Sequence, residues 1–182
     1  MRIAVYCSAR QNLPAEYRQV ADVVGRAIGQ GSHTLIYGGL SLGLMDTVSQ
    51  AAKETGARVV GIVPVSRKPF ISPANDETIM VTDLNERKAH MITLADMFIA
   101  MPGGYGTLDE LMSTIAFLRF TSNHSKPVVV ANIGGVFNPL IEQLHHMTGL
   151  GLMDPAVTEM LQIADTADEC ARIITQSTLT EP

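Results

Sequence analysis

Seven short apolar segments recur along the chain, and a longer segment of helical character follows most of them. The segments are Ile3–Cys7, Thr34–Tyr37, Arg58–Pro64, Thr78–Thr82, Met97–Met101, Pro127–Asn132 and Leu161–Ala164. Most are continuously apolar rather than alternating, which is typical of parallel strands with helices on both faces. The segments between them are long enough for the crossover helices that parallel strands require. The sequence therefore predicts an α/β fold with a doubly wound, mainly parallel sheet.

Two of the connecting segments show the helical period clearly. Ala15–Gln30 and Leu44–Thr55 each gather their apolar side chains on one face, and Gly56 is a stop signal for the second. Ser66–Asp76 contains two prolines and is predicted to be a loop. Because no linker or repeat interrupts the pattern, residues 1–182 are expected to form a single domain.

The composition excludes several classes of protein. Only 17% of the residues are charged, against roughly 25% in ordinary soluble domains, which suggests a buried subunit interface. The net charge is −5 and no basic run is present, so neither nucleic acid nor an anionic membrane is an expected partner. Cys7 and Cys170 cannot form a disulfide framework or a zinc cluster by themselves. No signal peptide or spanning segment is recognisable, so the cytoplasm is the expected compartment.

Two glycine-rich segments, Tyr37–Met45 and Met101–Glu110, follow predicted strands and precede predicted helices. Glycines at such a junction let the backbone approach an anion, and the helix start presents free N–H groups. Neither segment has the G-x-G-x-x-G spacing of dinucleotide-binding proteins. Leu44 and Met45 stand where a P-loop has Lys and Ser or Thr. A dehydrogenase and a nucleoside triphosphatase are therefore disfavoured, and there is no G-x-S-x-G nucleophile motif.

The helix expected from about Gly106 has an apolar stripe and charged or aromatic residues outside it. The stripe consists of Leu108, Leu111, Met112, Ile115 and Ala116. Helical geometry puts Glu110 roughly opposite this stripe, on the side of Phe117 and close to Phe120. Aromatic side chains outside the core stripe suggest a second covering surface, most simply a dimer partner. Glu110 is then either an ordinary helix-start acid or a site residue close to an interface.

Arg87 and Lys88 lie near the start of another predicted helix, at Asn85. Two cations at such a junction suit a phosphate, although a solvated charged turn is the simpler interpretation. The histidines show no metal-binding spacing, and no metal site is expected.

The segment Pro102–Glu110 reads Pro-Gly-Gly-Tyr-Gly-Thr-Leu-Asp-Glu and resembles the P-G-G-x-G-T-x-x-E signature of the LOG ("Lonely guy") family. This family comprises the cytokinin riboside 5′-monophosphate phosphoribohydrolases. Arg87-Lys88 stands where the family carries an Arg-Lys pair, and residues 38–45 resemble its G-G-G-x-x-G-L-M-G element. The order and spacing agree over about residues 1–165.

The resemblance implies a Rossmann-like fold, a homodimer, and hydrolysis of the N-glycosidic bond of adenosine 5′-monophosphate derivatives. The products would be a free base and ribose 5-phosphate, formed without a metal or a cofactor. Arg87 and Glu110 would be the catalytic pair, and the Pro102–Thr107 turn would hold the phosphate. The residues expected to bind substrate or phosphate are Gly103, Gly104, Tyr105, Gly106, Thr107, Lys88, Gly38, Gly39, Met45 and Ser8.

The chain departs from the family pattern around the expected nucleotide pocket. Leu40 and Asp46 replace two glycines of the first cluster, and residues 7–10 read Cys-Ser-Ala-Arg where many members have C-G-S-S. These changes leave the preferred base open. Two other functions remain possible on sequence grounds. One is a nucleotide- or cofactor-binding protein that does not hydrolyse its ligand. The other is an amino-acid decarboxylase, which would need pyridoxal phosphate on a lysine, and Lys88 is the only lysine near the signature.

Overall fold

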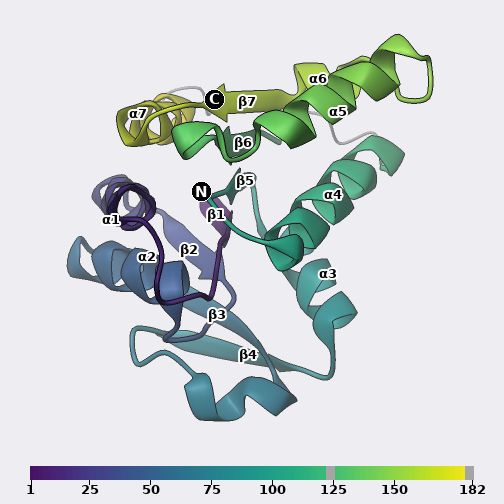
Figure 1. Cartoon of the computed structure of the whole chain (residues 1–182). Coiled ribbons are helices and arrows are strands. Elements are labelled where there is room, and N and C mark those ends of the chain that lie inside the picture. The colour runs from purple at the N-terminus through teal and green to yellow at the C-terminus, as the bar shows by residue number, and fades with distance from the viewer. Residues whose placement is uncertain (122–125, 179–182) are drawn as a thin grey trace.

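The computed structural model describes residues 1–121 and 126–178 and contains one seven-stranded sheet in which every strand pairing is parallel (Figure 1). The spatial order of the strands is β4-β3-β2-β1-β5-β6-β7. Their bounds are β1 Arg2–Tyr6, β2 Thr34–Tyr37, β3 Arg58–Pro64, β4 Glu77–Val81, β5 Met97–Ala100, β6 Val128–Ala131 and β7 Leu161–Ala164. All seven predicted strands are present, with ends that shift by one residue in most cases. The predicted doubly wound α/β fold is confirmed.

Helices cover both faces of the sheet (Figure 1). They are α1 Ala15–Gln30, α2 Gly43–Glu54, α3 Leu84–Leu94, α4 Tyr105–Phe120, α5 Asn138–Gly149, α6 Ala156–Glu159 and α7 Ala167–Thr178, with short 3₁₀ turns η1 Val65–Phe70 and η2 Ile133–Gly135. Helices α1, α2 and α7 pack on one face, and α3 to α6 pack on the other. The predicted loop Ser66–Asp76 contains most of η1, so it is more regular than expected. No helix in the described ranges is both long and apolar enough to cross a membrane.

Strand β1 shows why the apolar runs are continuous. Ile3 and Val5 point to the core under α1 and α2, whereas Ala4 and Tyr6 point to the core under α3 and α4. Successive side chains of a strand alternate between faces, so a strand covered on both sides must be apolar throughout. The register is fixed by Ile3, which pairs with Leu35 of β2 and Met97 of β5.

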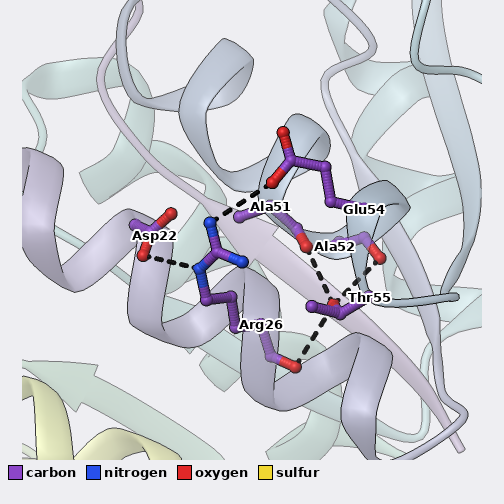
Figure 2. Close-up of polar contacts among 6 residues, drawn as sticks. All are labelled: Asp22, Arg26, Ala51, Ala52, Glu54 and Thr55. Atoms are coloured by element: carbon purple, nitrogen blue, oxygen red, sulfur yellow. Dashed lines mark hydrogen bonds and ion pairs between the residues drawn. The ribbon is translucent and has the colours of Figure 1, made fainter.

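Helices α1 and α2 pack closely because glycines on α1 face small residues on α2. A Cβ on Gly25 would lie 2.8 Å from the Ala51 Cβ, and one on Gly29 would overlap the Thr55 hydroxyl. Figure 2 shows that this hydroxyl donates to the Ala51 carbonyl at 2.8 Å and also reaches the Arg26 carbonyl. The Arg26 guanidinium bridges Asp22 on α1 and Glu54 on α2. These contacts fix α2, and therefore its first turn, relative to the sheet.

The strand order reverses at β1, which has β2 on one side and β5 on the other. The carboxyl ends of these strands meet where open α/β sheets bind ligands. Ser8, just after β1, connects the two glycine-rich turns. Its N–H donates to the Pro102 carbonyl at 3.2 Å, and its carbonyl accepts the Leu44 N–H at 2.9 Å. The turns after β1, β2 and β5 therefore form one continuous rim.

Candidate active site

A cavity of about 340 Å³ opens at this rim. It lies between the turn after β1, the first turn of α2, helix α3 and the start of α4. The lining residues are Cys7, Ser8, Ala9, Arg10, Met45, Arg87, Gly104, Tyr105, Gly106, Thr107 and Glu110. The predicted site residues Ser8, Met45, Arg87, Gly104, Tyr105, Gly106, Thr107 and Glu110 are thus brought together, whereas Gly38, Gly39, Gly103 and Lys88 do not line the cavity.

Arg87 and Glu110 form a buried ion pair at the cavity wall. Arg87 Nη2 donates to Glu110 Oε1 at 2.9 Å, and the two side chains are only 11% and 10% exposed. Burial raises the pKa of Glu110 to about 7, because the charged form loses its hydration. The Arg87 charge opposes this rise, and Asp109 adds to it. Glu110 therefore titrates near neutral pH, as a group that changes its charge state during a reaction should.

The prediction that Glu110 lies opposite the buried side of its helix is wrong. The buried residues of α4 are Thr107, Glu110, Leu111, Thr114, Ile115 and Leu118, whereas Ala116 of the predicted stripe is exposed. The apolar stripe covers only part of the buried face of α4, because this face also includes the polar residues Thr107, Glu110 and Thr114. Phe117 and Phe120 do lie outside the core and are exposed, as predicted.

The start of α3 positions both cations of the Arg-Lys pair. The Asp83 side chain accepts the N–H groups of Asn85 and Glu86 and so begins the helix one turn before Arg87. The Lys88 ammonium donates to both carboxylate oxygens of Asp109, at 2.7 and 2.8 Å. Both cations of the pair are therefore held by carboxylates of α4.

One buried donor of Arg87 lacks a protein partner among the described residues. Its Nε is buried and has no hydrogen-bond partner within residues 1–121 and 126–178. A buried N–H without a partner is costly, and such a group at a cavity wall suits an acceptor that arrives with a ligand. Arg87 therefore holds Glu110 through Nη2 and carries a buried Nε–H that the described residues leave unpaired.

Two of the predicted site glycines act by making room for the residues that line the cavity. A Cβ on Gly38 would clash with Arg87 Nη2, and a Cβ on Gly103 would overlap the Thr107 hydroxyl. Gly38 therefore permits the approach of Arg87 to Glu110, and Gly103 permits the close turn into α4. Gly39 has a φ of 73° and packs against Gly61, which explains it as a structural glycine.

The N-terminus of α4 is the better anion site of the two glycine-rich turns. Gly104 caps it without a side-chain hydrogen bond, and its first turn contains no acidic residue. In contrast, the first turn of α2 contains Asp46, which accepts a hydrogen bond from Ser41 Oγ at 2.6 Å. The N–H groups and positive dipole end of α4 thus remain available to a ligand, whereas at the start of α2 the Leu44 N–H is bound by the Ser8 carbonyl and the first turn carries a carboxylate.

A chain of hydroxyl groups anchors the turn of α4 that carries Glu110. Thr114 Oγ1 donates to the Glu110 carbonyl at 2.9 Å, so the Tyr6 hydroxyl donates in turn to Thr114 Oγ1 at 2.8 Å. Tyr6 belongs to β1, and the contact ties α4 to the centre of the sheet. Sequence reasoning missed Tyr6 and Thr114, since an apolar-looking strand gives no sign of a hydroxyl contact.

The turn after β1 also contributes Cys7, Ala9 and Arg10 to the cavity, which sequence reasoning did not select. Their position directly beside Ser8 was the available signal. Burial raises the pKa of the Cys7 thiol far above its ordinary value, so it stays protonated and is no nucleophile.

The fold and the site define a Rossmann-like α/β protein with a glycine-rich turn at a cavity beside a buried Arg–Glu pair. Residues 45–174 match the family model described as "Possible lysine decarboxylase". The chain is 36% identical over 173 residues to the Arabidopsis thaliana cytokinin riboside 5′-monophosphate phosphoribohydrolase LOG3, covering 94% of this chain and 80% of that one. It is 35% identical over 170 residues to the Oryza sativa subsp. japonica enzyme LOG, covering 92% and 70%. The chain belongs to the LOG family, a family of hydrolases, and the resemblance of the sequence to this family is confirmed.

A solved structure supports the fold alone. The molybdenum cofactor carrier protein of Chlamydomonas reinhardtii superposes with a TM-score of 0.75 at 22% identity, over 99% of this chain and 98% of that one. The same Rossmann-like framework is therefore found in a protein named for binding a cofactor.

Proposed function

We propose that the protein hydrolyses the N-glycosidic bond of adenosine 5′-monophosphates, including N6-modified ones, to a free base and ribose 5-phosphate. The observation that carries the proposal is the buried pair of Arg87 and Glu110 at the wall of a cavity next to a free helix N-terminus. The names of relatives at about one-third identity give the same reaction.

Glu110 supplies the chemistry at the sugar. Hydrolysis adds water across the bond between C1′ and the base, with the hydroxyl going to C1′ and the proton to the leaving base. The transition state has oxocarbenium character, which a carboxylate stabilises while it orients the water. The raised pKa of Glu110, about 7, also suits a group that takes the proton of this water.

Arg87 positions the carboxylate and contacts the substrate. Its Nη2 holds Glu110 Oε1 at 2.9 Å, and its guanidinium lines the cavity, where it can donate to an oxygen or nitrogen acceptor of the bound nucleotide. The charge of Arg87 also lowers the pKa of Glu110 against the effect of burial, so that part of the Glu110 population stays ionised in a site shielded from water.

The 5′-phosphate binds at the turn Pro102–Thr107. Backbone N–H groups at the start of α4 and the Thr107 hydroxyl are the neutral donors of this subsite. Phosphates commonly bind at a glycine-rich turn that leads into a helix. The phosphate is thus the main handle of the substrate, and nucleosides without it are poor substrates.

The two rival functions make different demands on the site. A pyridoxal phosphate-dependent decarboxylase needs a lysine in the cavity, but no lysine lines the cavity in the described part of the chain, and Lys88 is bound by Asp109. A ligand carrier needs no acid that titrates near neutral pH beside its ligand. The ion pair therefore favours hydrolysis over both.

We further propose that the protein is a cytoplasmic homodimer. Phe120 is 92% exposed and Phe117 is 43% exposed, both on α4 beyond the turn that carries Glu110. Leu84 at the start of α3 and Tyr105 at the cavity rim are also exposed. A second copy that covers these side chains would also shield the cavity from bulk water.

The test is chromatography of the bases released from a panel of nucleoside 5′-monophosphates, with AMP and N6-substituted AMP included. The proposal expects adenine-type bases and ribose 5-phosphate in equal amounts. Release of no base from any member, with the nucleotide still bound, would support the carrier function instead.

A further inference from the structure

We infer that Arg10 is the charged ligand of the substrate phosphate, an inference that rests on the proposed function. The charged side chains that line the cavity are Arg10, Arg87 and Glu110. Arg87 is paired with Glu110 through Nη2, and Lys88 is bound by Asp109 outside the cavity. Arg10 forms no ion pair with any residue in the described part of the chain. Among the described residues that line the cavity, it is therefore the cation without a carboxylate partner.

The backbone of Arg10 is held firmly although its side chain is exposed. Its N–H donates to Ser8 Oγ at 3.1 Å, and the Ser8 carbonyl is bound by the Leu44 N–H. Gly43, with a φ of 54°, lies so close that a Cβ there would clash with the Arg10 carbonyl. The turn is thus wedged against the start of α2, so the guanidinium extends from a fixed point beside the cavity.

The other groups at the cavity explain why a cation is needed. Gly104, Tyr105 and Gly106 offer the neutral N–H groups and partial positive charge of a helix start. A phosphate monoester carries nearly two negative charges at neutral pH, which such donors compensate only in part. A guanidinium adds a full charge and a planar pair of donors that matches two phosphate oxygens.

The start of α2 is the alternative place for an anion, but a carboxylate of the protein already lies in its first turn. Asp46 lies in that first turn and accepts hydrogen bonds from Ser41 and Gln50. A phosphate placed there would be repelled. Arg10 and the start of α4 therefore act on the same phosphate, and the protein selects phosphomonoesters over neutral nucleosides through Arg10.

The test uses ribose 5-phosphate as the probe, with neutral ribose beside it, and calorimetric titration of the full chain. Ribose 5-phosphate needs no turnover, so the measurement stands whether or not a nucleotide is hydrolysed. Loss of a charge-assisted contact predicts that Arg10→Ser weakens ribose 5-phosphate binding by about 10- to 100-fold. Arg10→Lys should lose less, because it keeps the charge without the paired donors. Arg172→Ser, which removes an exposed arginine of α7, is the matched control and should bind as the parent does.

Kinetics with AMP and adenosine distinguish the group that Arg10 contacts. We expect Arg10→Ser to raise the KM for AMP with little change in kcat, and so to narrow the preference for AMP over adenosine. If ribose 5-phosphate binds equally to parent and Arg10→Ser, or if affinity for adenosine falls as much as for AMP, Arg10 is not the phosphate ligand. A parent that binds ribose 5-phosphate through Arg10 but hydrolyses no nucleotide would keep this inference and overturn the proposed reaction.

Discussion

Arg87 passes over Gly38 so closely that any side chain at position 38 would occupy the space of the Arg87 guanidinium. The glycine comes from the turn after β2 and the arginine from α3, which are far apart in the chain. The glycine thus leaves the space in which Arg87 reaches Glu110, although it does not itself line the cavity.

Gly38→Ala should therefore displace Arg87 and reduce activity. Because positioned groups lose much of their effect when they move by about 1 Å, we expect kcat/KM for AMP to fall by at least about tenfold. Steady-state kinetics of base release is the measurement. Gly149→Ala, at the end of α5 where a Cβ would meet nothing, is the control and should keep parent activity. Equal activity of Gly38→Ala and Gly149→Ala would show that Arg87 needs no such space.

Activity should fall as the pH drops below neutrality. In the proposed reaction the carboxylate form of Glu110 acts, and burial raises the pKa of Glu110 to about 7 against the opposing charges of Arg87 and Lys88. We expect kcat/KM to fall about tenfold for each pH unit well below this pKa. A profile that stays flat from pH 5 to pH 8 in the parent would contradict the assignment.

The same shift has a consequence for stability. The folded pKa of Glu110 lies above its ordinary value of 4.5, so the folded state binds this proton more tightly than the unfolded state. The stabilisation is complete below pH 4.5 and is lost as the pH rises to about 7. Glu110→Gln removes this dependence, so its free energy of unfolding should decline less than that of the parent across this range. Denaturant titrations at pH 5 and pH 7.5 measure the difference.

The strands could be predicted well from the sequence. Each strand is covered by helices on both faces, so its side chains are apolar throughout and form a continuous run. The glycine turns indicated where the strand ends meet, but it was the resemblance to the LOG family that grouped Arg87 and Glu110 with the Pro102–Thr107 turn. The helical pattern misplaced Glu110 on its helix, since polarity does not distinguish a cavity wall from solvent. The contact between Tyr6 and Thr114 joins separate elements, which no local pattern records.

The contact from Tyr6 should matter for activity through the position of Glu110. Tyr6→Phe removes the hydrogen bond to Thr114 and should cost about 1 kcal/mol of stability. We also expect a lower kcat with an unchanged KM, because the turn of α4 that carries Glu110 loses its anchor to β1. Tyr37→Phe is the control, since it removes a hydroxyl that donates to Asn75 at 2.7 Å. If both variants lose stability equally and both keep the parent kcat, the contact is only structural.

Assembly should depend on the exposed aromatic side chains of α4. Phe117→Glu would place a charge in the proposed contact, so association and activity should weaken together. Light scattering at micromolar concentration, together with base release, measures both. Leu152→Glu is the control, because Leu152 is exposed beyond α5. A parent that scatters as a monomer with full activity would mean that the site needs no partner.

The phosphate requirement can be measured by comparing kcat/KM for AMP and adenosine in the parent. We expect adenosine to be a poor substrate, because it forgoes the charge-assisted contacts and the field of the α4 N-terminus. Similar kcat/KM values for AMP and adenosine would contradict the proposed phosphate subsite.

The most direct test is base release from AMP by the parent and by Glu110→Gln. The variant keeps the size of the side chain and an acceptor for Arg87 but loses the negative charge that would stabilise the oxocarbenium-like state. The parent should release adenine and ribose 5-phosphate, and the variant should do so with a kcat lower by about 10²-fold or more while it remains folded. Hydrolysis at the parent rate by Glu110→Gln would contradict the account and leave Glu110 as an acid at the start of a helix.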